Sequence, residues 1–240
     1  MHTIYAKRNK KADLMPVDVA INLLCVLAWK VGTKTYVSSR TNHVPIYNCT
    51  SGSSIPITWG RLEKMLHVHI IKNPMENMLW YPSGSFKNHV YIDRICRIFV
   101  HWIPAYCIDA VIYITGLKPK HLVKITHKMH KAMEALEYFA TREWLWDTQN
   151  VQTLYDELSS GDQSLYNFSF MNFDSWNNYF EEYALGAREF VMKSDPNSLK
   201  ACRKKMNYFY LMHQLFKIFT VIILYFLFSW LWKLFSHYAT

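Results

Sequence analysis

An apolar run without one charge, residues 218–232, lies near the C-terminus between two lysines. With its flanks, residues 215–235, it would form a helix about 31 Å long at about 1.5 Å per residue, close to the roughly 30 Å of a bilayer's hydrocarbon core. The lysines can keep their ammonium groups at the headgroups, and the tryptophans lie where an interfacial aromatic belt is expected. The pattern predicts a C-terminal membrane anchor, with a buried core helix as the alternative; its marker residues are Lys217, Ile218, Trp230, Trp232 and Lys233.

Apolar residues at helical spacing predict further helices along the chain. The first covers residues 16–29, with a proline that suits a first helical turn, and Gly32 ends it. Thr58 is placed to cap the next helix, which covers residues 59–69. Residues 150–158 predict another short helix.

Strand signals are confined to the first part of the chain. HTIY at residues 2–5 is strand-like, and VPIYNCTSG, residues 44–52, predicts a short strand that runs into a turn. Little strand signal follows, and residues 174–190 predict a helix whose aromatic rings pack in a core. The second half of the chain is therefore expected to be mainly helical.

Residues 91–116 are strongly apolar, but charged side chains and Pro104 interrupt them. Proline lacks the amide hydrogen that a continuous helix uses. The pattern favours a pair of core helices broken at Pro104 or a helix that lies in the membrane surface. A second transmembrane span is the remaining alternative.

A basic helix is predicted from Lys118 onward. Its apolar residues recur at alternating spacings of three and four, which is typical of a narrow packing seam; they are Leu122, Ile125, Met129, Ala132, Leu136 and Phe139. Lys124, Lys128 and Lys131 lie off that seam. A solvated basic face is the favoured interpretation, and contact with anionic lipid or with a ligand phosphate is the alternative.

Length and charge narrow the classes of protein and partner. The 240 residues allow one or two domains, and the net charge of +9 indicates an anionic partner. With an anchor present, membrane lipid or a nucleotide-bearing substrate is favoured over nucleic acid. Basic residues gather before the anchor and only Lys233 follows the apolar run closely, so the positive-inside rule places the body of the protein in the cytosol. Five scattered cysteines fit reduced cytosolic thiols.

Motifs of a self-contained active site are absent from the sequence. The seven glycines are too far apart for a nucleotide-binding glycine loop, and no Tyr-x-x-x-Lys pair occurs. His67 and His69 alternate, and His127 and His130 lie three apart, in both cases without a supporting set of cysteines or carboxylates. We therefore predict no catalytic, cofactor-binding or metal-ligating residue from motifs.

Several segments, taken together and in order, resemble parts of the alcohol-forming fatty acyl-CoA reductases of the animal or insect type. The first, KADLMPVDVAINLLCVLAW, resembles the end of that family's extended short-chain dehydrogenase domain, and the last three resemble its helical male sterility domain. Their order and spacing make the resemblance specific, and it covers nearly the whole chain. The segments are residues 11–29, 44–60, 73–82, 103–119, 139–151 and 173–191.

The resemblance implies an NADPH-dependent, two-step reduction of a long-chain acyl-CoA to a primary fatty alcohol. The cofactor would supply the hydride. The family's glycine-rich loop and Tyr-x-x-x-Lys pair have no counterpart in this sequence, so no catalytic residue is carried over, and the chain as given is expected to be inactive by itself, as a fragment or a short form. CoA or lipid phosphates are expected to contact Lys118, Lys120, Lys124 and Lys128.

The expected fold is mainly α, in four parts. Residues 1–72 would be the C-terminal remnant of the NAD(P)-binding Rossmann domain, an α/β piece, and residues 73–97 a connector. Residues 98–195 would form the helical sterility domain, and residues 196–240 the basic stretch and transmembrane helix. The endoplasmic reticulum or the peroxisome is the expected membrane. The alternative function is a tail-anchored, non-catalytic partner or regulator of a full-length reductase.

Overall fold

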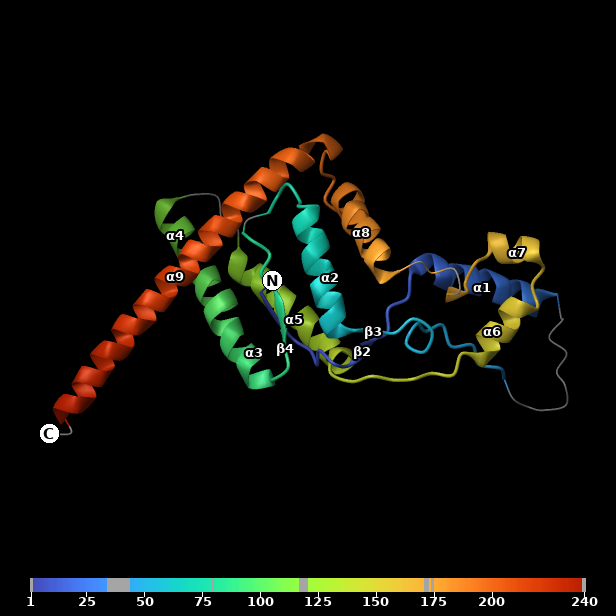
Figure 1. Ribbon diagram of the computed structural model, residues 1–240, viewed down its shortest axis with the longest axis horizontal. Coiled ribbons are helices and arrows are strands. Elements are labelled where there is room, and N and C mark those ends of the chain that lie inside the picture. The colour runs from blue at the N-terminus through green and yellow to red at the C-terminus, as the bar shows by residue number, and fades with distance from the viewer. Residues whose placement is uncertain are drawn as a thin grey trace. The chain divides into compact units, whose positions relative to one another are not determined.

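The computed structural model describes residues 2–33, 44–78, 80–116, 121–170, 173 and 175–238, and within them the protein is mainly helical (Figure 1). The chain forms two compact units. The first contains residues 1–65 and 84–178, and the second contains residues 66–83 and 179–240. The mainly α fold predicted from the sequence is confirmed.

Short strands tie distant segments of the first unit together. β1 (Thr3–Tyr5) pairs in parallel with β4 (Ser85–Lys87), and β2 (Lys11–Ala12) pairs antiparallel with β3 (Ile57–Thr58). The strand expected at HTIY is thus confirmed. Next to β3, the amide of Gly60 donates to the carbonyl oxygen of Arg8 at 2.9 Å. A Cβ at residue 60 would lie 3.0 Å from that oxygen, so a larger residue would push the Arg8 backbone away by a few tenths of an ångström, and glycine avoids this.

The apolar core of the first unit lies between α1 (Val17–Gly32) and α6 (Gln149–Asp156), with α7 (Ser160–Leu165) following. The buried cluster consists of Leu23, Val26, Leu154, Tyr155 and Phe168. The rings of Tyr155 and Phe168 meet edge to face, with centroids 5.1 Å apart. The predicted helix at residues 16–29, its end at Gly32 and the helix at residues 150–158 are all observed.

The strand predicted at residues 44–52 is wrong. Side-chain amides, rather than a strand ladder, hold this segment: Asn48 donates to the carbonyl oxygen of Asp147 at 2.8 Å, and Asn150 donates to that of Ile46 at 2.8 Å. Alternating β-branched residues therefore do not form a strand here, because no neighbouring strand is hydrogen-bonded to them among the described residues.

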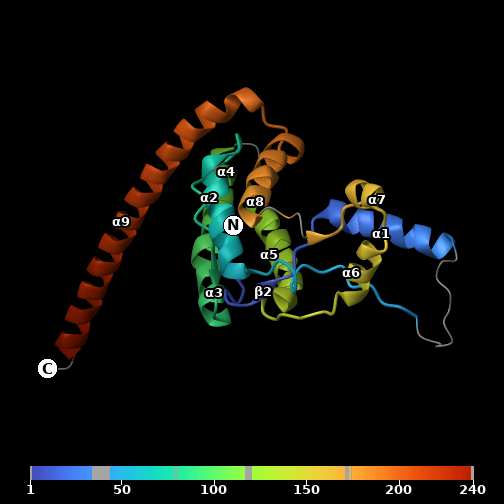
Figure 2. The ribbon, with the colours of Figure 1, turned by 45° about the vertical axis from the view of Figure 1, so that its right-hand side comes forward.

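Four helical elements build the rest of the first unit. α3 (Val90–Arg97), the π-helical turn η1 (Ile98–Trp102) and α4 (Ile103–Thr115) follow one another without interruption, and α5 (Leu122–Ala140) packs beside α4 (Figure 2). The helix is not broken at Pro104, contrary to one of the sequence interpretations. The amide of Ile103 donates five residues back to Ile98, so the wider turn adjusts the hydrogen bonding just before the proline.

Two helices of the second unit begin in the first unit. α2 (Trp59–Lys72) starts in the first unit with its predicted cap, since the Thr58 hydroxyl accepts the amide of Arg61 at 3.3 Å. α8 (Trp176–Gly186) runs into a second π-helical turn, η3 (Ala187–Val191). A short 3-10 turn, η4 (Pro196–Ser198), then leads into the long helix α9 (Leu199–Tyr238).

Polar contacts connect the segments before and along α9 to the connector after α2. The buried Arg188 guanidinium donates to the carbonyl oxygens of Pro74 and Asp195 at 2.5 and 2.7 Å. Further along, the indole of Trp80 donates to Nδ1 of His213 at 3.1 Å, and the Tyr81 ring stacks on that histidine. Further along α9, Ile218, Trp230 and Trp232 are exposed.

Candidate functional site

The combined helix α3–η1–α4 buries a polar stripe. Asp93 is fully buried, and Arg97 and His101 retain only 8% and 6% of their exposure. These residues are four apart, and Ala105 and the partly buried Asp109 continue the series. The stripe faces β1 and α5, which supply its partners. A polar interior of this kind is uncommon, because buried charges require pairing and hydrogen bonds.

The π-helical turn keeps this stripe on one side. Residues four apart in a regular α-helix drift by about 40° at each step, because the helix has about 3.6 residues per turn. A wider turn holds more residues per turn and therefore reduces the drift across residues 98–102. His101 lies within this turn, so its ring remains on the same side as Asp93 and Arg97.

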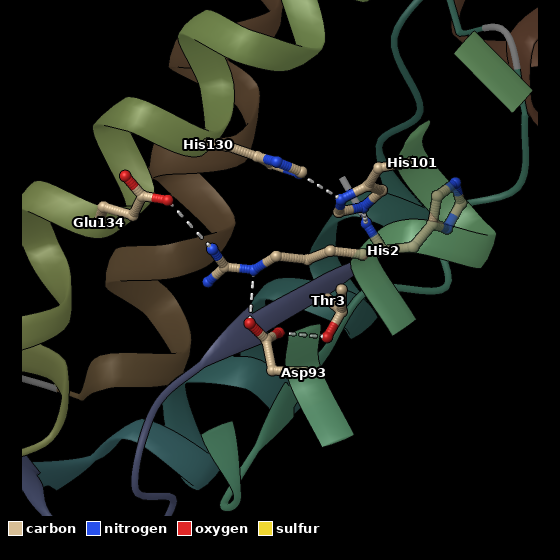
Figure 3. A network of polar contacts seen from close by, with 7 residues as sticks. His2, Thr3, Asp93, His101, His130 and Glu134 are labelled. Atoms are coloured by element: carbon tan, nitrogen blue, oxygen red, sulfur yellow. Dashed lines mark hydrogen bonds and ion pairs between the residues drawn. The ribbon is translucent and has the colours of Figure 1, made fainter. Parts of the chain in front are cut away.

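At the centre of the stripe, His101 and His130 form a neutral pair (Figure 3). The backbone amide of His2 donates to Nε2 of His101 at 2.9 Å. That nitrogen therefore carries no proton, and Nδ1 of His101 donates to Nε2 of His130 at 2.9 Å. Burial, followed by the proximity of His130, lowers the pKa of His101 to about 4. Burial and Arg97 likewise lower the pKa of His130, so both rings are neutral near pH 7.

Next to the histidines, Asp93 and Arg97 of the stripe form an ion pair. The Thr3 hydroxyl donates to Oδ1 of Asp93 at 2.6 Å, and Oδ2 of the same carboxylate lies 2.5 Å from Nε of Arg97. On the other side of the guanidinium, Nη1 of Arg97 lies 3.9 Å from the exposed Glu134 carboxylate. The network thus joins β1, α3 and α5 (Figure 3).

Asp109 connects α4 to the beginning of α5. Its carboxylate oxygens accept the amides of Leu122 and Val123 at 3.0 and 2.9 Å. These two hydrogen bonds lower the pKa of Asp109. A carboxylate at a helix N-terminus also interacts favourably with the helix dipole. The orientation of α5 against α4 is therefore fixed by a charge-assisted cap.

An open groove of about 530 Å³ lies beside this cap, and basic and aromatic residues line it together. Trp102 and Tyr106 present rings inclined at 27° with centroids 6.1 Å apart, and Lys124 and Lys128 extend from α5. Cations beside aromatic faces suit a ligand that combines phosphates with a flat ring. The remaining lining residues are Asp109, His121, Val123 and His127.

The structure describes two of the four lysines that were predicted to contact phosphates. Lys124 and Lys128 are exposed and line the groove, whereas Lys118 and Lys120 lie outside the described residues. The predicted anchor residues all fall in α9, where Lys217, Ile218, Trp230 and Trp232 are exposed. Lys233 also lies on α9.

The packing seam predicted for α5 is wrong. Ile125, Leu136 and Phe139 are more than half exposed, while the buried face carries Thr126, His130, Met133 and Ala140. The physical reason is the polar stripe. The neighbouring helix turns charged side chains and a histidine toward α5, so α5 buries a histidine and a threonine against them. Sequence reasoning missed His101 and Asp93 as partners, because His101 lies 29 residues from His130.

The described residues do not contain the glycine-rich loop by which the family that the chain resembles is expected to bind its nucleotide cofactor. They contain no glycine-rich phosphate cradle, and no group of three or more metal-ligating side chains was found among them. No hydride-transfer step is therefore assigned to the described residues.

Comparison with known proteins identifies the relatives of this chain. Residues 100–194 match the family model of the male sterility protein. The chain is 33% identical to human fatty acyl-CoA reductase 1 over 86% of its own length, 30% identical to the Drosophila melanogaster fatty acyl-CoA reductase wat over 92%, and 28% identical to cattle fatty acyl-CoA reductase 2 over 90%. It spans about two fifths of the length of each relative.

The resemblance seen in the sequence is therefore confirmed. The chain belongs to the fatty acyl-CoA reductase family and carries that family's male sterility domain. Because these relatives are reductases, a non-catalytic regulator is not favoured. The histidine pair, the Asp109 cap and the groove all fall within or beside the matched residues 100–194.

Proposed function

We propose that this chain is the C-terminal part of an NADPH-dependent, alcohol-forming fatty acyl-CoA reductase that acts at a membrane. The single observation that carries the proposal is the similarity to fatty acyl-CoA reductases over 86–92% of the chain. The reaction would reduce the thioester of a long-chain acyl-CoA to an aldehyde and then to a primary alcohol. Binding of NADPH and hydride transfer would lie outside the residues of this chain.

The domain organisation follows from this proposal. Residues 1–72 would complete the reductase domain, residues 73–97 would connect it to a sterility domain at residues 98–195, and residues 196–240 would carry the anchor. Support comes from α1, which buries Leu23 and Val26 and also exposes large apolar residues. Exposed Val17, Ile21 and Leu24 would pack against the remainder of the reductase domain.

The groove beside α5 would receive the CoA part of the substrate. Its two lysines would contact phosphates, and the Trp102 and Tyr106 rings would lie near the adenine. In the proposed reductase, replacing both Lys124 and Lys128 by alanine would raise the KM for acyl-CoA roughly two- to tenfold with little change in kcat, as expected for lost exposed charge contacts. Lys131→Ala is the matched control, because Lys131 is exposed on the same helix but does not line the groove.

Helix α9 would anchor the protein, with the body in the cytosol and the membrane being that of the endoplasmic reticulum or the peroxisome. Among the described residues, Val90–Thr115 and Pro196–Trp230 are long and apolar enough to cross a membrane. An anchored enzyme would take its acyl tail from the lipid phase and return the alcohol to it. Lys217 and Lys233 would mark the two headgroup regions.

The direct test uses the native protein, isolated with an antibody against this chain. Mass spectrometry would look for peptides encoded upstream of Met1, and the same sample would be incubated with labelled palmitoyl-CoA and NADPH. The proposal expects upstream peptides with a glycine-rich loop and a labelled fatty alcohol that depends on NADPH. Absence of labelled aldehyde and alcohol, both with palmitoyl-CoA and with labelled acyl-CoAs of shorter and longer chains incubated in the same way, would overturn it.

A further inference from the structure

The combined helix α3–η1–α4 is inverted in polarity. Its buried stripe carries Asp93, Arg97 and His101, whereas its exposed surface is almost wholly apolar. Phe99, Tyr113 and Ile114 are 64%, 88% and 80% exposed. We call the exposed apolar side chains of this helix the outer face; its large members include Tyr91, Ile95, Ile98, Phe99, Val111, Tyr113 and Ile114. A helix surrounded by water has the opposite arrangement.

Exposed apolar area alone does not identify what covers it. Helix α1 also exposes large apolar residues, but its buried side is apolar too, with Leu23 and Val26 in the core. A helix that is apolar on all sides is typical of a protein interior. In the combined helix, the charged Asp93 and Arg97 are instead buried and paired with each other. Helices exposed to lipid likewise turn their charged residues toward the protein interior and pair them there.

The neighbours of the combined helix determine its orientation to a bilayer. α5 packs along α4 and exposes Lys124, Lys128 and Lys131 along its length. A crossing helix would take these lysines into the hydrocarbon, where charged side chains are strongly disfavoured. The backbone of β1, which contacts α3, would also be carried to membrane depth as part of a two-stranded sheet with open edges. Only one side of the helix can therefore meet lipid.

We propose that α3–η1–α4 lies in the plane of the membrane interface, with its outer face in the lipid and its polar stripe turned to β1 and α5. Its 26 residues would extend about 39 Å along the surface. The outer face would enter about 5–10 Å, to the boundary of headgroups and acyl chains. Arg94, which is exposed near the beginning of the helix, can direct its guanidinium to the headgroups. This contact is additional to the proposed anchor α9.

Depth-dependent quenching tests the proposal in the full chain. The protein would be reconstituted in vesicles of mixed phosphatidylcholine and phosphatidylserine, with one environment-sensitive fluorophore on a cysteine introduced as Ile95→Cys, Phe99→Cys or Val111→Cys in a background without the native cysteines. These three sites are exposed, and agreement among them guards against one misfolded variant. A Lys131→Cys label on α5 is the matched control.

We expect the three outer-face labels to be quenched by lipids that carry a nitroxide near the headgroup, and less by a nitroxide near the acyl-chain end. The Lys131→Cys label is expected to escape quenching and to react with a water-soluble thiol reagent in a parallel unlabelled sample. Strongest quenching of Phe99→Cys by the deep nitroxide would overturn the proposal in favour of a crossing helix. Absence of quenching at all three sites would overturn it in favour of a face covered by protein.

Discussion

Two regions of the same unit bury opposite kinds of side chain. Between α1 and α6 the interior is Leu23, Val26 and Leu154 with aromatic rings, whereas between α3, α4 and α5 it contains Asp93, Arg97, His101 and His130. The first region gains stability by removing apolar area from water. In the second region, the charged side chains of Asp93 and Arg97 are buried and paired with each other. The polarity of the buried side of a helix, compared with that of its exposed side, therefore indicates whether protein or lipid surrounds the helix.

The largest expected effect comes from breaking the polar interior at one partner. Replacing Asp93 by alanine would leave the Arg97 guanidinium buried without its carboxylate, and we expect the free energy of unfolding in detergent to fall by about 3–5 kcal/mol. The double variant Asp93→Leu with Arg97→Met removes both charges and should cost less than the single change. Equal losses in the two variants, measured by denaturant unfolding, would show that the ion pair is not the cause.

The apolar interior should respond to a cavity instead. Leu154 is 1% exposed in the core cluster, so Leu154→Ala is expected to lower the unfolding free energy by about 2–5 kcal/mol. Leu165→Ala serves as the control, because Leu165 is 69% exposed on α7. A loss no greater than that of the control would mean that this cluster is not a packed core.

The histidine pair makes the polar interior sensitive to pH in a way that the apolar one is not. The folded-state pKa of His101, about 4, lies below its value of about 6.5 in the unfolded chain, so the unfolded state binds more protons between these values. The contribution is fully present above about pH 6.5, is lost progressively as pH falls toward 4, and should total roughly 3 kcal/mol.

Thermal unfolding across that pH range checks this expectation. His101→Gln should reduce the pH dependence by the contribution of His101, since a glutamine does not titrate, while His130, whose pKa is also lowered, keeps its own contribution. Its side-chain oxygen retains an acceptor for the His2 amide. An unchanged pH profile in that variant would place the titrating group elsewhere.

Part of the fold was predictable because its signals are local. The Thr58 cap, the Gly32 terminus and the helical periodicity of residues 16–29 and 150–158 all act within a few residues. The chain's family was likewise predictable, since ordered segments carried the resemblance.

The polar interior could not be predicted, because pattern reading assumes that apolar residues face inward. That assumption put Ile125, Leu136 and Phe139 of α5 in a packing seam, whereas the structure exposes them. The partners of the stripe are also distant in sequence: 90 residues separate Thr3 from Asp93, and 29 separate His101 from His130. The pairing of β1 with β4 was missed for the same reason.

The smallest expected effect lies on the outer face. Phe99→Ala truncates a ring that is 64% exposed, and it leaves no closed cavity because few protein atoms surround it. We expect the unfolding free energy in detergent to change by about 0.5 kcal/mol or less. A loss as large as that of Leu154→Ala would show that protein, rather than lipid or detergent, covers this residue.

The most direct test of the comparison measures two apolar surfaces in one experiment. Spin labels on cysteines at Phe99→Cys, on the inverted helix, and at Leu24→Cys, on the exposed side of α1, would be examined in the full chain in lipid nanodiscs. Collision rates with oxygen, which dissolves in lipid, would be compared with those of a water-soluble nickel chelate. We predict that collisions with oxygen dominate at residue 99 and not at residue 24. Equal behaviour of the two labels would contradict it, because the polarity of the buried side would then say nothing about the surroundings.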